Sequence, residues 1–281
     1  MASFGTRLAA VFEEYGHLCV GIDPHTALLE QWGLKASAQG LREFGLRTVE
    51  AAAGRVGAVK PQVAFFEAFG PAGLGALAEV QQAAREAGLL VIADAKRGDI
   101  GSTMAAYAQA WLDPAAELAA DALTVSPYLG FGSLRPAVEA AQQHGTGIFA
   151  LVLTSNPEGA EVQLARDEAG RTVAGSVAEA AAEANGAALG AGAPLGDAGL
   201  VVGATTARLA TEHGIDLTAG RPPILAPGYG AQGASAAQLK ADFGPAWGQV
   251  VVNSSRGILR CGPDVEALRG AIDRARMELA G

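Results

Sequence analysis

Eight short, mostly apolar runs recur along the chain, and a segment with helical spacing follows each of them, as at 73–87 and 134–143. Regular alternation of strand and helix implies a parallel sheet, because parallel strands are usually joined by a helix. Eight such units in 281 residues favour a closed (β/α)8 TIM barrel over an open doubly wound sheet. No Gly-x-Gly-x-x-Gly follows the first run, which weakens a dinucleotide-binding interpretation. The predicted strands are residues 18–22, 58–62, 89–93, 122–126, 147–154, 200–203, 223–227 and 249–253.

One connection is much longer than the others. Residues 157–195 begin with a polar piece, 158–171, and continue with an alanine-rich stretch that predicts a helix from about 176 to 189. This segment has too few large apolar residues to form a core of its own. We therefore expect one domain spanning 1–281, with an insertion at about 157–195 after the fifth strand.

The most chemically informative stretch follows the third predicted strand and has the pattern D-x-K-x-x-D. Side chains alternate along a strand, so Asp94 and Lys96 should lie on one face. Charges placed where a buried strand ends are unfavourable unless they are paired or used in chemistry. A salt bridge would account for Asp94 and Lys96 but not for Asp99. Asp99, Ser102 or Thr103 could instead cap a helix that we predict to begin near 104.

In such barrels the chemistry gathers at the carboxyl ends of the strands, and here every strand ends in polar residues. We predict a single pocket that Asp23, Lys60 and Ser126 help to line. Asp23 precedes a proline and could cap a turn, and Lys60 could lie on the surface, but its place at a strand end favours the pocket. We expect Arg97 to form a structural ion pair.

The seventh and eighth strand ends predict a phosphate site. Gly228, Gly230 and Gly233 free the backbone for close approach to a ligand, and Arg256 and Gly257 follow the eighth strand. Loops at these two positions often hold a phosphate on backbone N–H groups, and an arginine adds a bidentate cation. Glycines in turns are common, so the prediction depends on both ends together with Arg256.

The net charge of −9 argues against a nucleic-acid partner. Glu13 and Glu14 occupy the region where a signal peptide would be apolar, and no run approaches the ~20 apolar residues of a membrane helix. We therefore expect a cytoplasmic protein that binds no membrane. The two cysteines, Cys19 and Cys261, are predicted to be small buried hydrophobes rather than a disulfide.

No metal site is predicted. His25, His144 and His213 lack ligand spacing with one another or with carboxylates, although Asp23 and Asp94 could in principle share a cation.

The chain resembles orotidine 5′-phosphate decarboxylase, specifically the longer bacterial type 2 subgroup, over nearly its whole length. The motifs that carry the resemblance are DAKRGDIGST at 94–103, GIDP at 21–24, VKP at 59–61, LTSNP at 153–157, APGYGAQG at 226–233 and VNSSRG at 252–257. The subgroup often has Asn where this chain has Ser126.

The resemblance implies the last step of UMP synthesis, without a cofactor. It implies an alternating catalytic array of Lys60, Asp94, Lys96 and Asp99. It also implies that Asp99 and Thr103 come from the partner subunit, so that the enzyme is a homodimer.

The resemblance also implies the contacts to the nucleotide substrate. Asp23 and Lys60 would contact ribose hydroxyls, Ser155 the pyrimidine ring, and Gln232 and Arg256 the phosphate. The loop after Pro227 would close over the substrate and exclude water.

The mechanism implied is electrostatic, since loss of CO2 from C6 leaves a carbanion that no adjacent carbonyl delocalises. Lys96 would stabilise that charge and donate the proton that replaces CO2, while Asp94 would lie near the departing carboxylate. Asp94 and Asp99 would keep Lys96 charged.

Three alternatives stay open. A sister barrel enzyme could decarboxylate a keto-sugar phosphate or synthesise a hexulose phosphate with a divalent metal. A Schiff-base aldolase could use Lys60 or Lys96 as its nucleophile. A phosphate-ligand sensor is the non-enzymatic alternative, but sensing does not need a lysine between two aspartates.

Overall fold

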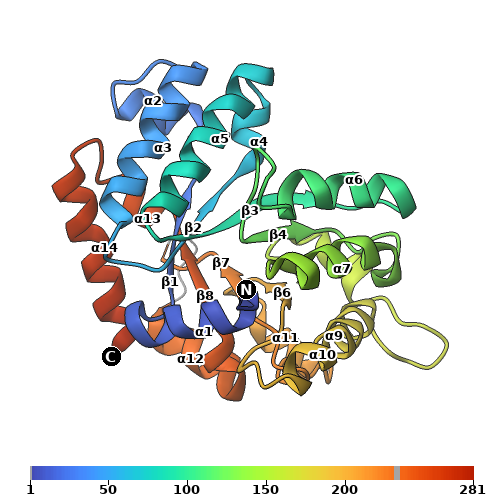
Figure 1. Ribbon diagram of the computed structural model, residues 1–281. Helices are drawn as coiled ribbons and strands as arrows, with labels where there is room; N and C mark the ends of the chain where they lie inside the picture. Colours follow the sequence, from blue (N-terminus) through green and yellow to red (C-terminus); the bar gives the residue numbers. More distant parts are fainter. Residues whose placement is uncertain (1, 231–234) are drawn as a thin grey trace.

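The computed structural model describes residues 2–230 and 235–281. Eight parallel strands, each hydrogen-bonded to the next in chain order, form a closed barrel with helices around it (Figure 1). The predicted (β/α)8 TIM barrel is therefore confirmed. The strands are β1 (Leu18–Ile22), β2 (Ala58–Pro61), β3 (Leu90–Arg97), β4 (Ala122–Val125), β5 (Gly147–Leu153), β6 (Ala198–Val202), β7 (Ile224–Pro227) and β8 (Val250–Ser254).

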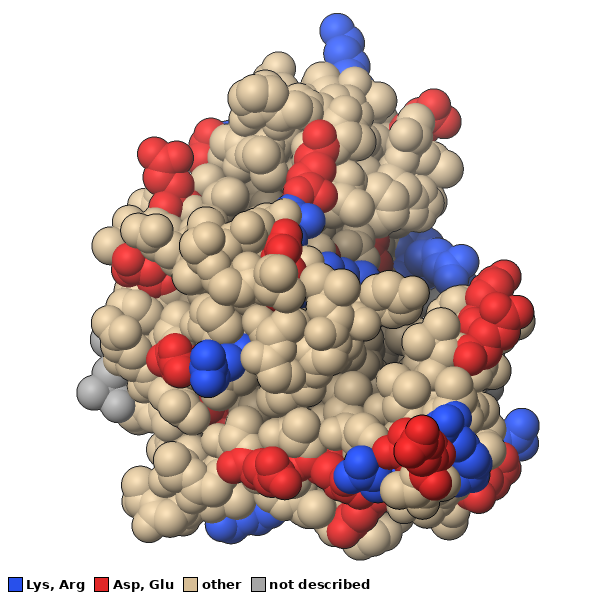
Figure 2. Space-filling view, turned by 90° about the vertical axis from the view of Figure 1, so that its right-hand side faces the viewer, with Lys and Arg blue, Asp and Glu red and all other residues tan. Residues whose placement is uncertain are grey.

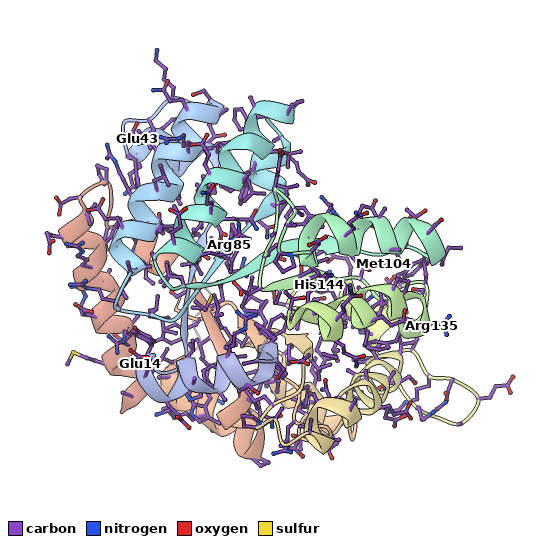
Figure 3. All side chains as sticks on the ribbon, viewed as in Figure 1. Glu14, Glu43, Arg85, Met104, Arg135 and His144 are labelled. Carbon is purple, nitrogen blue, oxygen red and sulfur yellow. The ribbon has the colours of Figure 1, made fainter. Side chains whose placement is uncertain are left out.

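The helices of the outer ring turn apolar side chains toward the barrel and polar ones toward solvent. Met104 is fully buried on α6, whereas Arg135, at the start of α7, projects away with a 79% exposed side chain (Figure 3). The helices are α1 (Phe4–Tyr15), α2 (Thr26–Gln31), α3 (Ala38–Ala52), α4 (Val63–Glu67), α5 (Gly70–Glu86), α6 (Gly101–Leu112), η1 (Phe131–Leu134), α7 (Arg135–His144), α8 (Gly159–Gln163), α9 (Val173–Ala184), α10 (Gly186–Gly190), α11 (Ala207–Glu212), α12 (Ala236–Phe243), η2 (Gly244–Gln249), α13 (Arg256–Leu259) and α14 (Val265–Ala280).

Helix α1 packs against the amino-terminal end of the barrel. Phe4 meets Phe149 of β5 edge to face, with ring centroids 5.8 Å apart, and both rings are fully buried. The backbone N–H of Gly5 donates to Asp197, which precedes β6, at 2.9 Å. These contacts fill the amino-terminal end of the barrel with side chains, so the polar strand ends lie at the opposite end.

The connection after β5 differs in detail from the prediction. The alanine-rich helix α9 begins at Val173 rather than near 176, because the Thr172 side chain caps it by accepting a hydrogen bond from Gly175 at 3.0 Å. It ends at Ala184, and the predicted remainder forms the separate short helix α10. Val177 and Ala181 of α9 are buried in the main core.

The predicted cap of α6 is wrong. The helix begins at Gly101, and its N-cap is Ile100, which makes no side-chain cap hydrogen bond. Asp99 instead accepts a hydrogen bond from the adjacent Ile100 N–H at 2.8 Å, and Ser102 and Thr103 already lie inside the helix.

Both cysteines have free thiols, but only Cys19 is buried as predicted, and Cys261 is partly exposed. Across the described residues, no helix combines the length and the apolar character that crossing a membrane requires.

Candidate active site

The carboxyl ends of the strands surround a cavity of about 800 Å³. The structure brings most of the predicted site residues to its wall, because all strands of a parallel barrel end on one side. The predicted residues that line it are Asp23, Lys60, Asp94, Lys96, Ser126, Ser155, Pro227 and Arg256.

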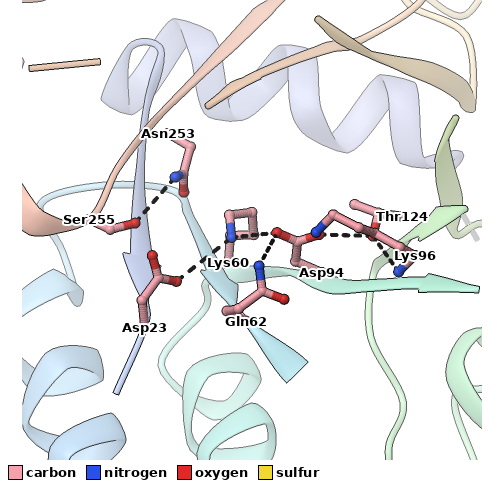
Figure 4. A network of polar contacts seen from close by, with 8 residues as sticks. All are labelled: Asp23, Lys60, Gln62, Asp94, Lys96, Thr124, Asn253 and Ser255. Carbon is pink, nitrogen blue, oxygen red and sulfur yellow. Dashed lines mark hydrogen bonds and ion pairs between the residues drawn. The ribbon is translucent and has the colours of Figure 1, made fainter. Parts of the chain in front are cut away.

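Asp94 lies in the wall of this cavity, between two lysines (Figure 4). Its Oδ2 is 2.9 Å from Nζ of Lys60, and its Oδ1 is 2.5 Å from Nζ of Lys96. The Lys60 side chain is only 3% exposed, whereas that of Lys96 is 45% exposed. Lys60 therefore holds the Asp94 carboxylate from the buried side, and Lys96 presents its ammonium group to the cavity.

Two further groups, for which no role was predicted, donate hydrogen bonds to Asp94. Gln62 Nε2 donates to Oδ2 at 2.9 Å, and the Thr124 hydroxyl donates to Oδ1 at 3.0 Å. Gln62 is visible in the sequence as a polar residue at a strand end. Thr124 stands in an otherwise apolar run, and nothing in the sequence distinguishes it from a core residue.

The backbone at Lys96 has a positive φ of 50°, an uncommon conformation for a residue with a side chain. The pairing of β3 with β4 is irregular between Ala93 and Arg97, and the Lys96 N–H donates to the Thr124 hydroxyl at 2.9 Å. Such backbone strain costs about 1–3 kcal/mol and clusters at functional sites. Here it turns the Lys96 side chain back toward Asp94.

Lys60 and Asp94 stabilise each other as ions. Burial alone would raise the pKa of Asp94, but the attraction of Lys60 and Lys96 outweighs it and holds that pKa well below its ordinary value. Burial alone would lower the pKa of Lys60, but Asp94 and Asp23 outweigh it and raise that pKa above its ordinary value. Lys60 and Asp94 are therefore both ionised at neutral pH.

The wall beside Lys60 carries two buried acceptors that have no hydrogen-bond partner within the described residues. One is Oδ1 of Asp23, 3.9 Å from Lys60 Nζ, and the other is Oδ1 of Asn253. Asn253 Nδ2 donates to Ser255 Oγ at 3.3 Å. A Cβ at Gly21 would lie 1.9 Å from Ser255 Oγ, so any larger residue there would displace the Ser255 side chain. Unpartnered acceptors suit a ligand that donates hydrogen bonds, such as a sugar hydroxyl.

Asp99 and Thr103 are not among the residues that line the cavity of their own chain. Thr103 is exposed, and Ile100 beside Asp99 is 61% exposed. The cavity of a single chain thus holds Lys60, Asp94 and Lys96 of the predicted array, and Asp99 does not line it.

The predicted phosphate end is described only in part, because Gln232 and Gly233 lie outside the described residues. Gly228 and Gly230 have positive φ angles of 106° and 74°, which supports the predicted need for glycine. Arg256 lines the cavity, is exposed, and forms no ion pair within the described part of the chain.

Arg97 forms the structural ion pair that was predicted for it, with Glu67. Its guanidinium also lies 5.7 Å from the ring centroids of both Tyr107 and Trp111.

The long connection after β5 forms an apolar wall of the same cavity, through Val162 of α8 and Val173, Ala174 and Val177 of α9. Figure 2, which turns the right-hand side of Figure 1 toward the viewer, shows acidic and basic side chains interspersed on that face. The described residues form no continuous basic patch there. Groups of three or more metal-binding side chains are also absent from the described ranges.

The comparisons with known proteins agree with one another. A family model described as "Orotidine 5'-phosphate decarboxylase / HUMPS family" matches residues 16–271. The orotidine 5′-phosphate decarboxylase of Salinispora tropica is 54% identical over 274 residues, covering 98% of this chain and 96% of the relative. That of Streptomyces coelicolor is 54% identical over 281 residues, covering 99% and 98%. A crystal structure from Streptomyces avermitilis, assigned as the same enzyme, superposes with a TM-score of 0.94 at 52% identity, covering 100% of this chain and 95% of that one.

Proposed function

The chain belongs to the orotidine 5′-phosphate decarboxylase / HUMPS family, and we infer that it is a carboxy-lyase that converts orotidine 5′-phosphate to UMP and CO2. The observation that carries this inference is the position of Asp94 between Lys60 and Lys96 in the cavity. The carboxylate of Asp94 would repel the substrate carboxylate that leaves as CO2. The ammonium group of Lys96 would stabilise the carbanion that remains.

We assign Lys96 as the group that meets C6 of the pyrimidine. Its partly exposed ammonium group would stabilise the carbanion as CO2 departs and then give it a proton. Asp94 would lie near the departing carboxylate, and Lys60, Gln62 and Thr124 would hold it in place. Fixed charges of this kind need no reorganisation during the reaction, which is why they stabilise its transition state strongly.

Other residues around the cavity would bind the remaining parts of the nucleotide. Asp23 and Lys60 would bind the ribose, in keeping with the unpartnered acceptor of Asp23. Ser155 would bind the pyrimidine ring, and Pro227, Gln232 and Arg256 would hold the phosphate end. We also propose that 157–195 belongs to the barrel domain, since its side chains join the core and the cavity wall.

Product analysis tests the function. Purified protein incubated with orotidine 5′-phosphate should release CO2 and UMP in equal amounts. Binding of the nucleotide without either product would instead support a sensor. A covalent adduct after borohydride reduction would support the Schiff-base aldolase.

Chelation should leave the activity unchanged. Lys96 supplies the positive charge at C6 in this proposal, so initial rates with and without EDTA should agree. Rates are measured as loss of orotate absorbance, and the control is EDTA-treated protein with Mg²⁺ restored. A rate that falls with EDTA and returns with Mg²⁺ would move the assignment to the metal-dependent sugar-phosphate enzymes.

We further propose a homodimer in which Asp99 and Thr103 reach the partner's cavity. Support comes from their absence from the cavity of their own chain and from the exposed Ile100 between them. A heterodimer of Lys96→Ala and Asp99→Ala subunits, co-expressed with different tags, then has one complete site and should show about half of wild-type activity. If Asp99 acted within its own chain, neither site would be complete and the heterodimer would be inactive.

A further inference from the structure

We propose that Gln163 is a positioning residue, which holds the backbone beside Ser155 so that Ser155 meets the pyrimidine ring. The inference rests on the proposed function and gives the connection after β5 a role in it. That connection forms a wall of the cavity and also supplies Gln163, whose hydrogen bonds to Thr154 we call the clamp on Ser155.

The clamp consists of two hydrogen bonds from one amide side chain. Gln163 Oε1 accepts from the Thr154 backbone N–H at 2.9 Å, and Gln163 Nε2 donates to the Thr154 hydroxyl at 2.7 Å. The Thr154 hydroxyl in turn lies 2.7 Å from Asn156 Oδ1, to which it donates. Both neighbours of Ser155 in the chain are therefore held by side chains, while the Ser155 side chain itself makes no hydrogen bond within the described residues.

The opposite side of the loop is also fixed. A Cβ at Gly203, after β6, would lie 3.4 Å from both Cβ and N of Ser155. The Thr206 hydroxyl donates to the Leu153 carbonyl at 3.1 Å. Ser155 thus lies between the β6 exit on one side and Gln163 on the other, and removing either support lets the loop move.

Glutamine suits the clamp, because its amide accepts a hydrogen bond from the Thr154 N–H and donates one to the Thr154 hydroxyl. A carboxylate would have to accept from both groups, which would take the hydroxyl proton away from Asn156, and an apolar side chain would make neither bond. Gly159 is matched to it, because a Cβ there would lie 2.8 Å from Thr154 Oγ1. Helix α8 has only five residues, too few to be stable alone, so Gln163 also ties this helix to the barrel.

The test is a double-mutant cycle. Gln163→Met keeps the length of the side chain and removes both hydrogen bonds, so kcat/KM for orotidine 5′-phosphate should fall about 10- to 100-fold, mainly through KM. In a Ser155→Ala background the same change should lower kcat/KM by less than about threefold, since the clamp acts through Ser155. The control is Gln82→Met on α5, which removes an exposed bond to Glu86 and should leave both parameters unchanged.

Amide hydrogen exchange of Thr154 gives a readout that needs no substrate. Gln163→Met should speed exchange of this amide about tenfold or more, because its hydrogen-bond acceptor is gone, while Gln82→Met should not. Unchanged Thr154 exchange would overturn the clamp. Equal losses in the wild-type and Ser155→Ala backgrounds would overturn its action through Ser155. If the Thr154 amide exchanges as expected in the wild type and in Gln163→Met but the wild type yields no UMP, the proposed function is wrong and the clamp is still supported.

Discussion

Replacing Lys96 with alanine should lower kcat for orotidine 5′-phosphate by about 10⁵-fold, since in the proposed mechanism Lys96 is both the proton donor and the cation beside C6. Loss of orotate absorbance measures the rate. The variant should still fold, because Asp94 keeps its contacts with Lys60, Gln62 and Thr124.

The matched control is Lys35→Ala, which removes an exposed lysine between α2 and α3. It should behave as wild type in both rate and melting temperature. A Lys96→Ala variant that keeps more than about a tenth of wild-type kcat would contradict the role of Lys96 as proton donor, for which losses of 10²–10⁴ are usual.

Replacing Asp94 with asparagine should cost both stability and activity. The change leaves the buried ammonium of Lys60 with only Asp23, at 3.9 Å, as a counter-ion. Breaking a buried ion pair from one side costs about 3–5 kcal/mol. The melting temperature should therefore fall by about 10 °C in a chain of this size, and turnover should be lost together with the support of Lys96.

A surface pair provides the control for this second change. Asp273→Asn removes the partner of Arg55, 3.4 Å away, with an Asp273 side chain that is 48% exposed. Such pairs contribute about 0–1 kcal/mol, so the melting temperature should barely change. Equal effects of the two substitutions on unfolding would refute the claim that Asp94 compensates a buried charge.

The stability difference between wild type and Asp94→Asn should depend on pH in a defined way. The pKa of Asp94 is lowered on folding, so its contribution is present above about pH 4 and is lost as the pH falls further. The pKa of Lys60 is raised, so its contribution is present below about pH 10 and is lost only at higher pH. Unfolding by denaturant should thus give a constant difference between about pH 5 and 9.

The grouping of site residues at the strand ends could be predicted from the sequence. Each apolar run is followed by polar residues, and in a closed parallel barrel all of these must lie at the same end. Asp23, Lys60 and Asp94 come together simply because their strands end on the same side of the barrel. The same argument could not reach Thr124, since a threonine within an apolar strand has no distinguishing pattern until the register with β3 is known.

Other features depend on contacts between distant segments. The positive φ of Lys96 follows from the irregular pairing of β3 with β4, which local sequence does not encode. The start of α9 was misplaced because helical periodicity does not reveal that Thr172 caps it. The role of Gln163 cannot be predicted from the sequence, because it depends on α8 folding back so that this side chain reaches Thr154.

A crystal structure of Lys96→Ala with orotidine 5′-phosphate bound would show directly whether the cavity at the strand ends holds the substrate as proposed. We expect the C6 carboxylate beside Asp94, the ribose against Asp23 and Lys60, and the phosphate at Arg256. A nucleotide bound elsewhere, or bound here with its phosphate toward Asp94, would contradict the proposal.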